Sequence, residues 1–544
     1  MKKLLFLLLL AVANNSYATI FITTTETWGT QNVAEDIVVE AGGTLIITGI
    51  LSFGNPMAPL DEYKIIIEDG GYVYSANGVL QPITGYKWYG IVVNGTHMNT
   101  PNLAPALELD NFAILRSQRG IVMNVQGSPF YNQKVMVKNT LFANNRETHV
   151  VVDIGSGSYF NRDNSPNPVS FQYCDFLYTS ETTSFKSPLW IKRIRGLEFF
   201  RCTFDNTGGF GNVGIHWSGC KDVLVEECIF SSVGEVGIVM HAESRDIDII
   251  NNYFDPSDMP SKYFGIAVGC IINTGEAVNM NIEDNLFMSP DPNNNYVGVC
   301  NGNDDYPGET AFLTIDDNRF QNFETGITSL ETTGASFIEE NIFDEYVYAI
   351  DITGDNSSTW VRCNSFRQGI AAIVIGSNGT LFNGLNSGSG TDANNKFEGS
   401  QVDIANLNPM FTYNYQHSNE NTHPANDFSG PYSIINASTI HLCEPEIDEH
   451  KMGFTENEDA TIATTEPELY PNPTANHIFL AGLPSQPINI SIINALGQVE
   501  LSLVSSGNAA AEQIDMSGLK PGIYFIKAVD PASSFRFHSR IVKR

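Results

Sequence analysis

The chain has 544 residues, and its 61 acidic and 29 basic side chains give it a formal net charge of −32 at pH 7. A charge of this sign argues against nucleic acid and anionic lipid as partners, and it favours cations or basic surfaces. Eight cysteines are too few to build a disulfide scaffold of this length, so the fold must rest on an apolar core.

The first residues are typical of a secretory signal. Lys2 and Lys3 precede an apolar run from Leu4 to Ala13, and Ser16-Tyr17-Ala18 offers a cleavage site after Ala18. The run is too short to cross a bilayer, and no later stretch reaches the roughly 18 apolar residues that a spanning helix needs. We therefore expect a signal peptide at residues 1–18, no transmembrane segment, and a protein that passes through the periplasm and is secreted or held at the outer-membrane surface.

The body of the chain repeats one short phrase: an aliphatic or aromatic residue, two mostly polar ones, Asn or Cys, any residue, then Phe. Its last position falls at residues 113, 142, 176, 204, 230, 254, 287, 320, 343, 366 and 397, with Ala113 and its Asn111 as a degenerate first copy. Repeats of roughly 20 to 50 residues build solenoids, and β-branched and aromatic residues between Gly, Asn and Asp turns predict strands. A second strand begins with Gly and an aliphatic residue, as in Gly214-Ile215 and Gly237-Ile238. We therefore expect an all-β protein with a parallel β-helix of about a dozen coils over residues 19–443.

The Asn or Cys of the phrase should occupy one position in every coil. We expect Asn252, Asn285, Asn318, Asn341 and Asn364 to form a hydrogen-bonded ladder, with each Asn in the left-handed conformation of a tight turn. Cys174, Cys202 and Cys228 fill the same position as buried thiols, or alternatively as a disulfide between adjacent coils. Cys270 and Cys300 lie one coil apart and form a second pair that an oxidising compartment could join.

Basic side chains cluster in the middle of the repeat. Strand alternation places Ile215 inside, so His216 should point outward, and His241 should do so one coil later. Lys192, Arg193 and Arg195 lie one coil earlier. Together they suggest a basic cleft for an acidic polysaccharide, in which His216, His241, Lys192 or Arg193 could abstract a proton beside a carboxylate. The alternative is that these side chains are ordinary surface residues.

Paired carboxylates precede the predicted Asn ladder in three consecutive coils. They are Glu283-Asp284, Asp316-Asp317 and Glu339-Glu340. Like charges on neighbouring strands repel unless they are screened or bridged, and Ca²⁺ takes six to eight oxygen ligands. The sequence therefore raises two readings of this stripe, a calcium site and a salt-screened surface.

Two further segments follow the repeat. Residues 444–466 are acidic, rich in Thr and poor in aromatic residues, which is typical of a linker. Residues 467–544 contain several short apolar runs split by Gly and Pro, which predicts a small Ig-like β-sandwich.

This last segment resembles a specific family. It contains Tyr470-Pro471-Asn472-Pro473, the turn Leu496-Gly497-Gln498, the strand Leu519-Lys520-Pro521-Gly522-Ile523-Tyr524 and a basic end, in that order. These motifs resemble the type A C-terminal sorting domain of cargo for the type IX secretion system. The resemblance implies handling by that system's translocon and sortase, followed by removal of the domain and either release or attachment to surface lipopolysaccharide.

The body, residues 20 to about 440, resembles right-handed parallel β-helix proteins of the pectate-lyase-like superfamily. The resemblance does not extend to catalytic motifs: Trp190-Ile191-Lys192-Arg193 stands where pectate lyases have Trp-Ile-Asp-His, and Asp304-Asp305 lacks the His motif of polygalacturonases. The same coil serves enzymes and adhesins. The sequence therefore favours a protein that binds glycans or matrix without catalysis. The alternative is a polysaccharide lyase or glycoside hydrolase acting on an acidic polysaccharide.

Overall fold

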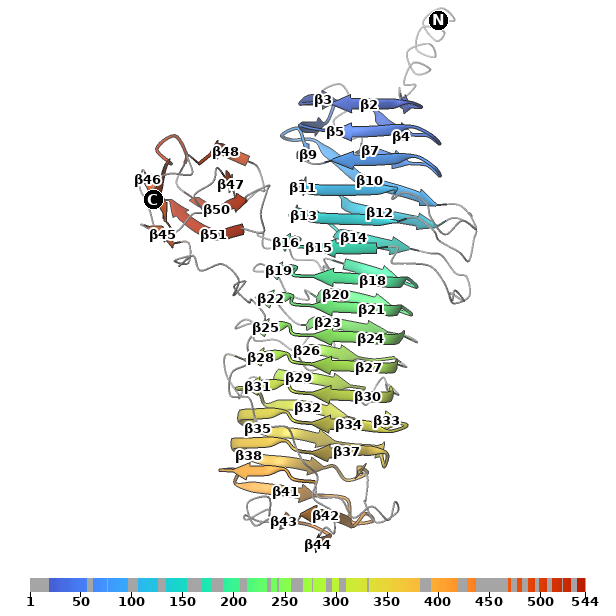
Figure 1. Ribbon diagram of the computed structural model, residues 1–544, viewed down its shortest axis with the longest axis vertical. Helices are drawn as coiled ribbons and strands as arrows, with labels where there is room; N and C mark the ends of the chain where they lie inside the picture. Colours follow the sequence, from blue (N-terminus) through green and yellow to red (C-terminus); the bar gives the residue numbers. More distant parts are fainter. Residues whose placement is uncertain are drawn as a thin grey trace, which may run out of the picture. The chain divides into compact units, whose positions relative to one another are not determined.

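The structure, a computed structural model, shows an all-β protein (Figure 1). It describes residues 19–55, 62–75, 77–95, 106–125, 134–153, 169–177, 189–205, 213–231, 236–241, 244–255, 268–275, 277–289, 296–302, 310–329, 332–381, 393–417, 428–436, 468–470, 477–481, 488–494, 499–505, 511–520, 522–529 and 536–543. The predicted signal peptide and linker lie outside these residues. No helix among the described residues is long and apolar enough to cross a membrane.

The first unit is a parallel β-helix whose coils each contribute strands to three faces. Face 1 consists of β1 (Thr19–Ile22), β4 (Asp36–Val39), β7 (Glu62–Ile67), β10 (Lys87–Gly95), β12 (Arg119–Val125), β14 (Thr148–Asp153), β17 (Leu189–Lys192), β20 (Val213–Ser218), β23 (Val236–His241), β26 (Val268–Asn273), β29 (Tyr296–Asn301), β32 (Thr325–Ser329), β41 (Val402–Asn406) and β43 (Phe428–Ser429). The second halves of β35 (Ile342–Ile352) and β38 (Ser365–Ile375) complete it.

Face 2 follows face 1 in every coil. It consists of β2 (Thr25–Trp28), β5 (Thr44–Ile47), β8 (Tyr72–Ser75), β15 (Val169–Gln172), β18 (Arg195–Phe200), β21 (Lys221–Glu226), β24 (Ser244–Ile250), β27 (Ala277–Glu283), β30 (Thr310–Asp316), β33 (Thr332–Thr333), β34 (Ser336–Glu339) and β37 (Thr359–Arg362). The first halves of β11 (Leu107–Leu115) and β13 (Val135–Ala143) belong to it as well.

Face 3 closes the coil. It consists of β3 (Gln31–Val33), β6 (Ile50–Phe53), β9 (Gly78–Pro82), β16 (Asp175–Leu177), β19 (Thr203–Asp205), β22 (Ile229–Ser231), β25 (Tyr253–Asp255), β28 (Leu286–Met288), β31 (Arg319–Gln321) and β40 (Lys396–Glu398), together with the remaining halves of β11, β13, β35 and β38. Two small parallel pairs accompany the coils: β36 (Asp355–Asn356) with β39 (Thr380–Leu381), and β42 (Tyr413–His417) with β44 (Tyr432–Asn436).

The Phe of the repeated phrase forms a stack inside the coils. Adjacent rings from Phe142 to Phe397 have centroids 4.6–5.3 Å apart, which follows the spacing of parallel strands. The glycine near the start of the face 1 strand in the same coil makes room for each ring, since a Cβ on Gly214 would lie 3.1 Å from the ring of Phe230. The degenerate first copy is shifted by one residue from our prediction, because Ile114, not Ala113, pairs with Phe142.

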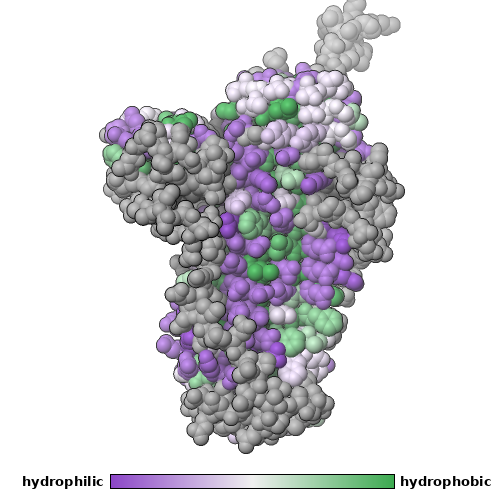
Figure 2. All heavy atoms as spheres, in the orientation of Figure 1, coloured by the Kyte–Doolittle hydropathy of each residue, from purple (hydrophilic) through white to green (hydrophobic). Residues whose placement is uncertain are grey.

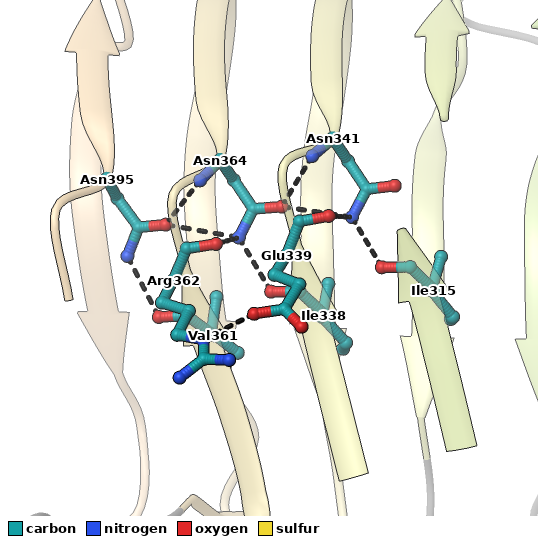
Figure 3. Close-up of polar contacts among 8 residues, drawn as sticks. All are labelled: Ile315, Ile338, Glu339, Asn341, Val361, Arg362, Asn364 and Asn395. Atoms are coloured by element: carbon teal, nitrogen blue, oxygen red, sulfur yellow. Dashed lines mark hydrogen bonds and ion pairs between the residues drawn. The ribbon is translucent and has the colours of Figure 1, made fainter. Parts of the chain in front are cut away.

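The Asn ladder forms as predicted. Asn252, Asn285, Asn318, Asn341, Asn364 and Asn395 are buried. From Asn285 onward, the side-chain oxygen of each accepts hydrogen bonds from the backbone N–H and the side-chain amide of the Asn before it, whereas the oxygen of Asn252 accepts the backbone N–H of Cys228 (Figure 3). Each amide from Asn285 to Asn364 also donates to two backbone carbonyls, one in its own coil and one in the coil before, as Asn318 does to Asp316 and Ile282.

The predicted left-handed conformation of the ladder Asn is wrong. The residue before it takes the positive φ instead, as at Asp284 (56°), Asp317 (52°) and Glu340 (58°). The turn of that residue carries the chain around the corner from face 2 to face 3, and the following Asn can then point its amide into the core.

Among the described residues, six cysteines are buried free thiols and Cys363 is disulfide-bonded. Cys174, Cys202 and Cys228 remain free and replace Asn in the ladder, where the Cys228 thiol accepts the N–H of Cys202 at 3.4 Å. The pair suggested for Cys270 and Cys300 does not form. Cys270 belongs to the core inside the coils, whereas Cys300 lies in a separate apolar cluster on the outer side of face 1.

The second unit contains two antiparallel sheets. One has β45 (Glu468–Tyr470), β46 (His477–Ala481) and β49 (Ala511–Asp515), and the other has β48 (Val499–Val504), β47 (Asn489–Asn494), β50 (Gly522–Val529) and β51 (Arg536–Lys543). Residues from both sheets share one buried apolar cluster, which includes Ile478, Ile490 and Ile526. The Ig-like character of this sandwich stays a prediction.

Candidate functional site

The predicted basic side chains lie on the outer side of face 1. Alternation along β17, β20 and β23 buries Leu189, Ile215 and Ile238 completely, so their neighbours point outward. Trp190 pairs in register with His216, and Lys192 pairs with Ser218, which pairs in turn with His241. These three adjacent coils therefore bring Lys192, His216 and His241 together with Trp190, a residue that the sequence had not singled out as a site.

The side chains of this group contact one another through their rings. The ring centroids of Trp190 and His216 lie 4.3 Å apart, and those of His216 and His241 lie 4.6 Å apart. The Lys192 ammonium lies 5.1 Å from the centroid of the Trp190 ring, within cation–π range. We call Trp190, Lys192, His216 and His241 the face 1 surface.

Both imidazoles of the face 1 surface are held neutral. Burial, followed by the charges of His241 and Lys192, lowers the pKa of His216 to about 3, and burial also lowers the pKa of His241. The Thr274 hydroxyl donates to the Met240 carbonyl at 3.1 Å, so its hydrogen bond with His241 uses the Nδ1–H of that ring. A base with a pKa near 3 is poorly matched to proton abstraction at neutral pH.

The two arginines predicted beside this group lie outside the run of ring contacts. Arg193 lies in the turn after β17 with φ 57°, where its backbone N–H donates to the Ser218 carbonyl. Arg195 begins β18 on face 2 and forms an ion pair with Asp222 at 2.5 Å. The predicted basic cleft is therefore reduced to one ammonium beside an aromatic group.

The predicted acidic stripe lies at the corner between faces 2 and 3. Glu283, Asp316 and Glu339 pair in register on consecutive coils, but the next residue in this row is Arg362, whose guanidinium binds Glu339 (Figure 3). Glu283 accepts a hydrogen bond from Asn281 at 2.8 Å. The sequence hypothesis missed Arg362, although its place two residues before Asn364 could have revealed it.

Three of the six predicted metal ligands come close together. Carboxylate oxygens of Asp316, Asp317 and Glu340 lie within 4.8 Å of one another, whereas Glu283, Asp284 and Glu339 do not belong to this group. Burial, followed by repulsion from Asp317, Glu339, Glu340 and Glu283, raises the pKa of Asp316 to about 7. Oxygen ligands of this kind suit Ca²⁺, with water completing its shell, so the three carboxylates fit such an ion.

Two parts of the chain match known families. Residues 188–366 match the right handed beta helix region, and residues 468–543 match the secretion system C-terminal sorting domain. The chain is a right-handed β-helix protein with a type IX secretion sorting domain. This sorting domain marks the β-helix protein for export to the cell surface or the extracellular space, as the sequence predicted.

Solved structures that match the chain include the Azotobacter vinelandii mannuronan C-5 epimerase AlgE6 A-module, with 9% identity, a TM-score of 0.25, and coverage of 74% of this chain and 91% of that chain. A tailspike protein mutant of E. coli bacteriophage HK620 in complex with hexasaccharide has 10% identity, a TM-score of 0.35, and coverage of 93% and 86%. Likenesses this weak say nothing about activity. No curated protein matches the chain.

We expect Asp316→Asn to stabilise the β-helix protein at pH 8 and to have a smaller effect at pH 5. The pKa of Asp316 is about 7 in the folded protein against 3.8 for an unperturbed Asp, so the stability that its protonation contributes is fully present below pH 3.8 and is lost as the pH rises through 7. Asn is neutral at every pH. Because the carboxyl is half-exposed, solvent screening limits the gain at pH 8 to about 1 kcal/mol.

Urea unfolding at pH 8 and pH 5 checks this prediction. Asp355→Asn is a control of opposite sign, since hydrogen bonds from the Ser357 side chain and backbone lower the pKa of Asp355. That variant should lose stability at pH 8. An Asp316→Asn variant that is less stable than the parent at pH 8 would contradict the repulsion inferred for this corner.

Proposed function

We propose that this exported β-helix protein binds glycans that carry carboxylate groups, through the face 1 surface, and does not cleave them. The observation that carries the proposal is the run of ring contacts from Trp190 through His216 to His241 beside the Lys192 ammonium. Aromatic rings offer flat apolar faces on which pyranose rings stack, and an adjacent ammonium attracts a carboxylate.

The state of the imidazoles supports binding over catalysis. His216, with its pKa of about 3, and His241, whose pKa burial also lowers, would be neutral ring partners near pH 7. A pKa of about 3 is far from the neutral pH at which a general acid or base would act, and burial shifts the pKa of His241 in the same direction. Lys192 is then the charged contact of this surface, and at physiological ionic strength it acts within a Debye length of about 8 Å in spite of the acidic net charge.

We expect the secreted protein to be retarded in a native gel that contains polygalacturonate, and Lys192→Gln to weaken this binding about fivefold, by roughly 1 kcal/mol. Trp190→Ala should weaken it by a similar factor. Lys221→Gln is the matched control, because Lys221 lies on face 2 and pairs with Asp246 at 3.6 Å.

Incubation of the secreted protein with polygalacturonate in solution distinguishes binding from cleavage. We expect neither ultraviolet-absorbing unsaturated products nor new reducing ends, with or without Ca²⁺. Product formation that is lost in His216→Ala would establish the lyase or hydrolase alternative. Equal retardation of the parent and Lys192→Gln would rule out the face 1 surface as the binding site.

A further inference from the structure

One aromatic residue on face 2 occupies a backbone position that does not suit it. Near the start of successive face 2 strands, one residue per coil has a positive φ: Gly196 (72°), Asp222 (53°), Asp246 (52°), Asn279 (56°) and Phe312 (61°). Gly, Asp and Asn tolerate the left-handed conformation, whereas a bulky aromatic residue in it is an outlier. Strain of this kind is a reason to look for function.

The side chain of Phe312 contributes little to the core. It is 52% exposed, while the next residue, Leu313, is fully buried inside the coil. Its ring rests against the next coil, where a Cβ on Gly334 would lie 3.1 Å from it. The strained backbone and exposed ring of Phe312 therefore cost stability, and the packing of this ring offsets little of that cost.

Two more aromatic side chains lie on the outer side of the next two coils. Phe337 pairs in register with Thr314 on one side and with Trp360 on the other. The Arg362 guanidinium lies 5.0 Å from the centroid of the Phe337 ring and 5.9 Å from that of Trp360, and Glu339 holds it there. Figure 2 shows the pale green patch over this part of face 2, next to the purple surface of the preceding strands.

We propose that Phe312, Phe337 and Trp360 form a second glycan-binding surface, which takes a glycan without acidic groups. The rings supply stacking faces, and Arg362 supplies hydrogen-bond donors for sugar hydroxyls. The row two residues further along the same strands holds Asp316, Glu339 and Arg362, and the carboxylates of Asp317 and Glu340 lie beside Asp316. Acidic groups therefore outnumber the one guanidinium here, which disfavours polyanions and admits neutral chains. This surface lies on a different face from the face 1 surface, and its ligand class is different.

Native gels that contain xylan, mannan or amylose test the proposal with the secreted protein. We expect at least one of these neutral polysaccharides to retard it, and Phe312→Asn to weaken that binding roughly fivefold. Asn is the residue that the same row has at Asn279, so this variant should fold at least as well as the parent. Trp360→Leu should have a similar effect on binding.

Two control variants on face 1 test whether the loss of binding is specific to the face 2 surface. Phe21→Asn removes a Phe that is 55% exposed on face 1 and should leave binding unchanged, as should Lys192→Gln. Failure of all three polysaccharides to retard the protein, or retardation that is the same in Phe312→Asn and Trp360→Leu, would overturn the proposal. So would a dimer in solution that Phe312→Asn dissociates, because the patch would then be an interface between copies of the chain.

Discussion

Asn318→Ala should lower the free energy of unfolding of the β-helix by about 3 kcal/mol or more. The Asn318 oxygen accepts the backbone N–H and the amide of Asn285, at 3.0 and 2.9 Å, and its own amide donates to the Ile282 and Asp316 carbonyls at 2.8 and 2.7 Å. Alanine leaves these groups without that partner inside a fully buried row. Each buried polar group left unsatisfied costs about 1–3 kcal/mol.

The cysteine part of the ladder supplies the matched variant. The Cys228 thiol donates to the Phe199 carbonyl at 3.6 Å and accepts the N–H of Cys202 at 3.4 Å, so one sulfur repeats part of the pattern that the Asn amide makes. Asn318→Cys should therefore lose only about half as much stability as Asn318→Ala. Urea unfolding followed by circular dichroism measures both. If Asn318→Ala lowered the free energy of unfolding no more than Asn318→Cys does, the hydrogen bonds of the ladder would not be the source of its stability.

The repeated phrase was enough to predict the coil and its ladder, because both depend on the same residue type recurring at the same position of each repeat. The ladder Asn, the stacked Phe and the outward direction of His216 follow from strand alternation alone. The backbone conformation at the corner between faces 2 and 3 could not be predicted from the repeat. Asp317 and Glu340 look like surface carboxylates in the sequence, yet they take the left-handed turn that the ladder Asn was expected to take.

The candidate sites were only partly predictable, because their chemistry depends on neighbours from other coils. No local pattern reveals that burial would keep His216 neutral, since its surroundings come from Trp190 and His241 in adjacent coils. Phe312 looks like an ordinary apolar residue in the sequence. Its left-handed φ becomes informative only when the coils are aligned and the same row is found to contain Asp and Asn.

Removal of residues 467–544 should abolish export while leaving the β-helix folded. Among the described residues, the apolar core of the β-helix and that of the sorting domain have no residue in common. The truncated protein should therefore keep its own core and its ladder. Without the sorting domain at residues 468–543, however, the type IX system has no signal to recognise, so the protein should accumulate in the periplasm.

Expression of both forms in a host with an active type IX system, followed by immunoblots of the medium, cell surface and periplasm, measures this prediction. We expect the extracellular and surface fractions of the truncated form to fall by roughly tenfold or more, because the sorting domain is the part of the chain that the type IX system recognises. Circular dichroism of the periplasmic protein should still show a β-rich fold, because a protein that failed to fold would also fail to appear outside. Fusion of residues 467–544 to a periplasmic reporter is the reciprocal experiment, and it should carry the reporter out. A truncated form that reaches the medium at the level of the full chain would mean that the export signal lies in the β-helix itself.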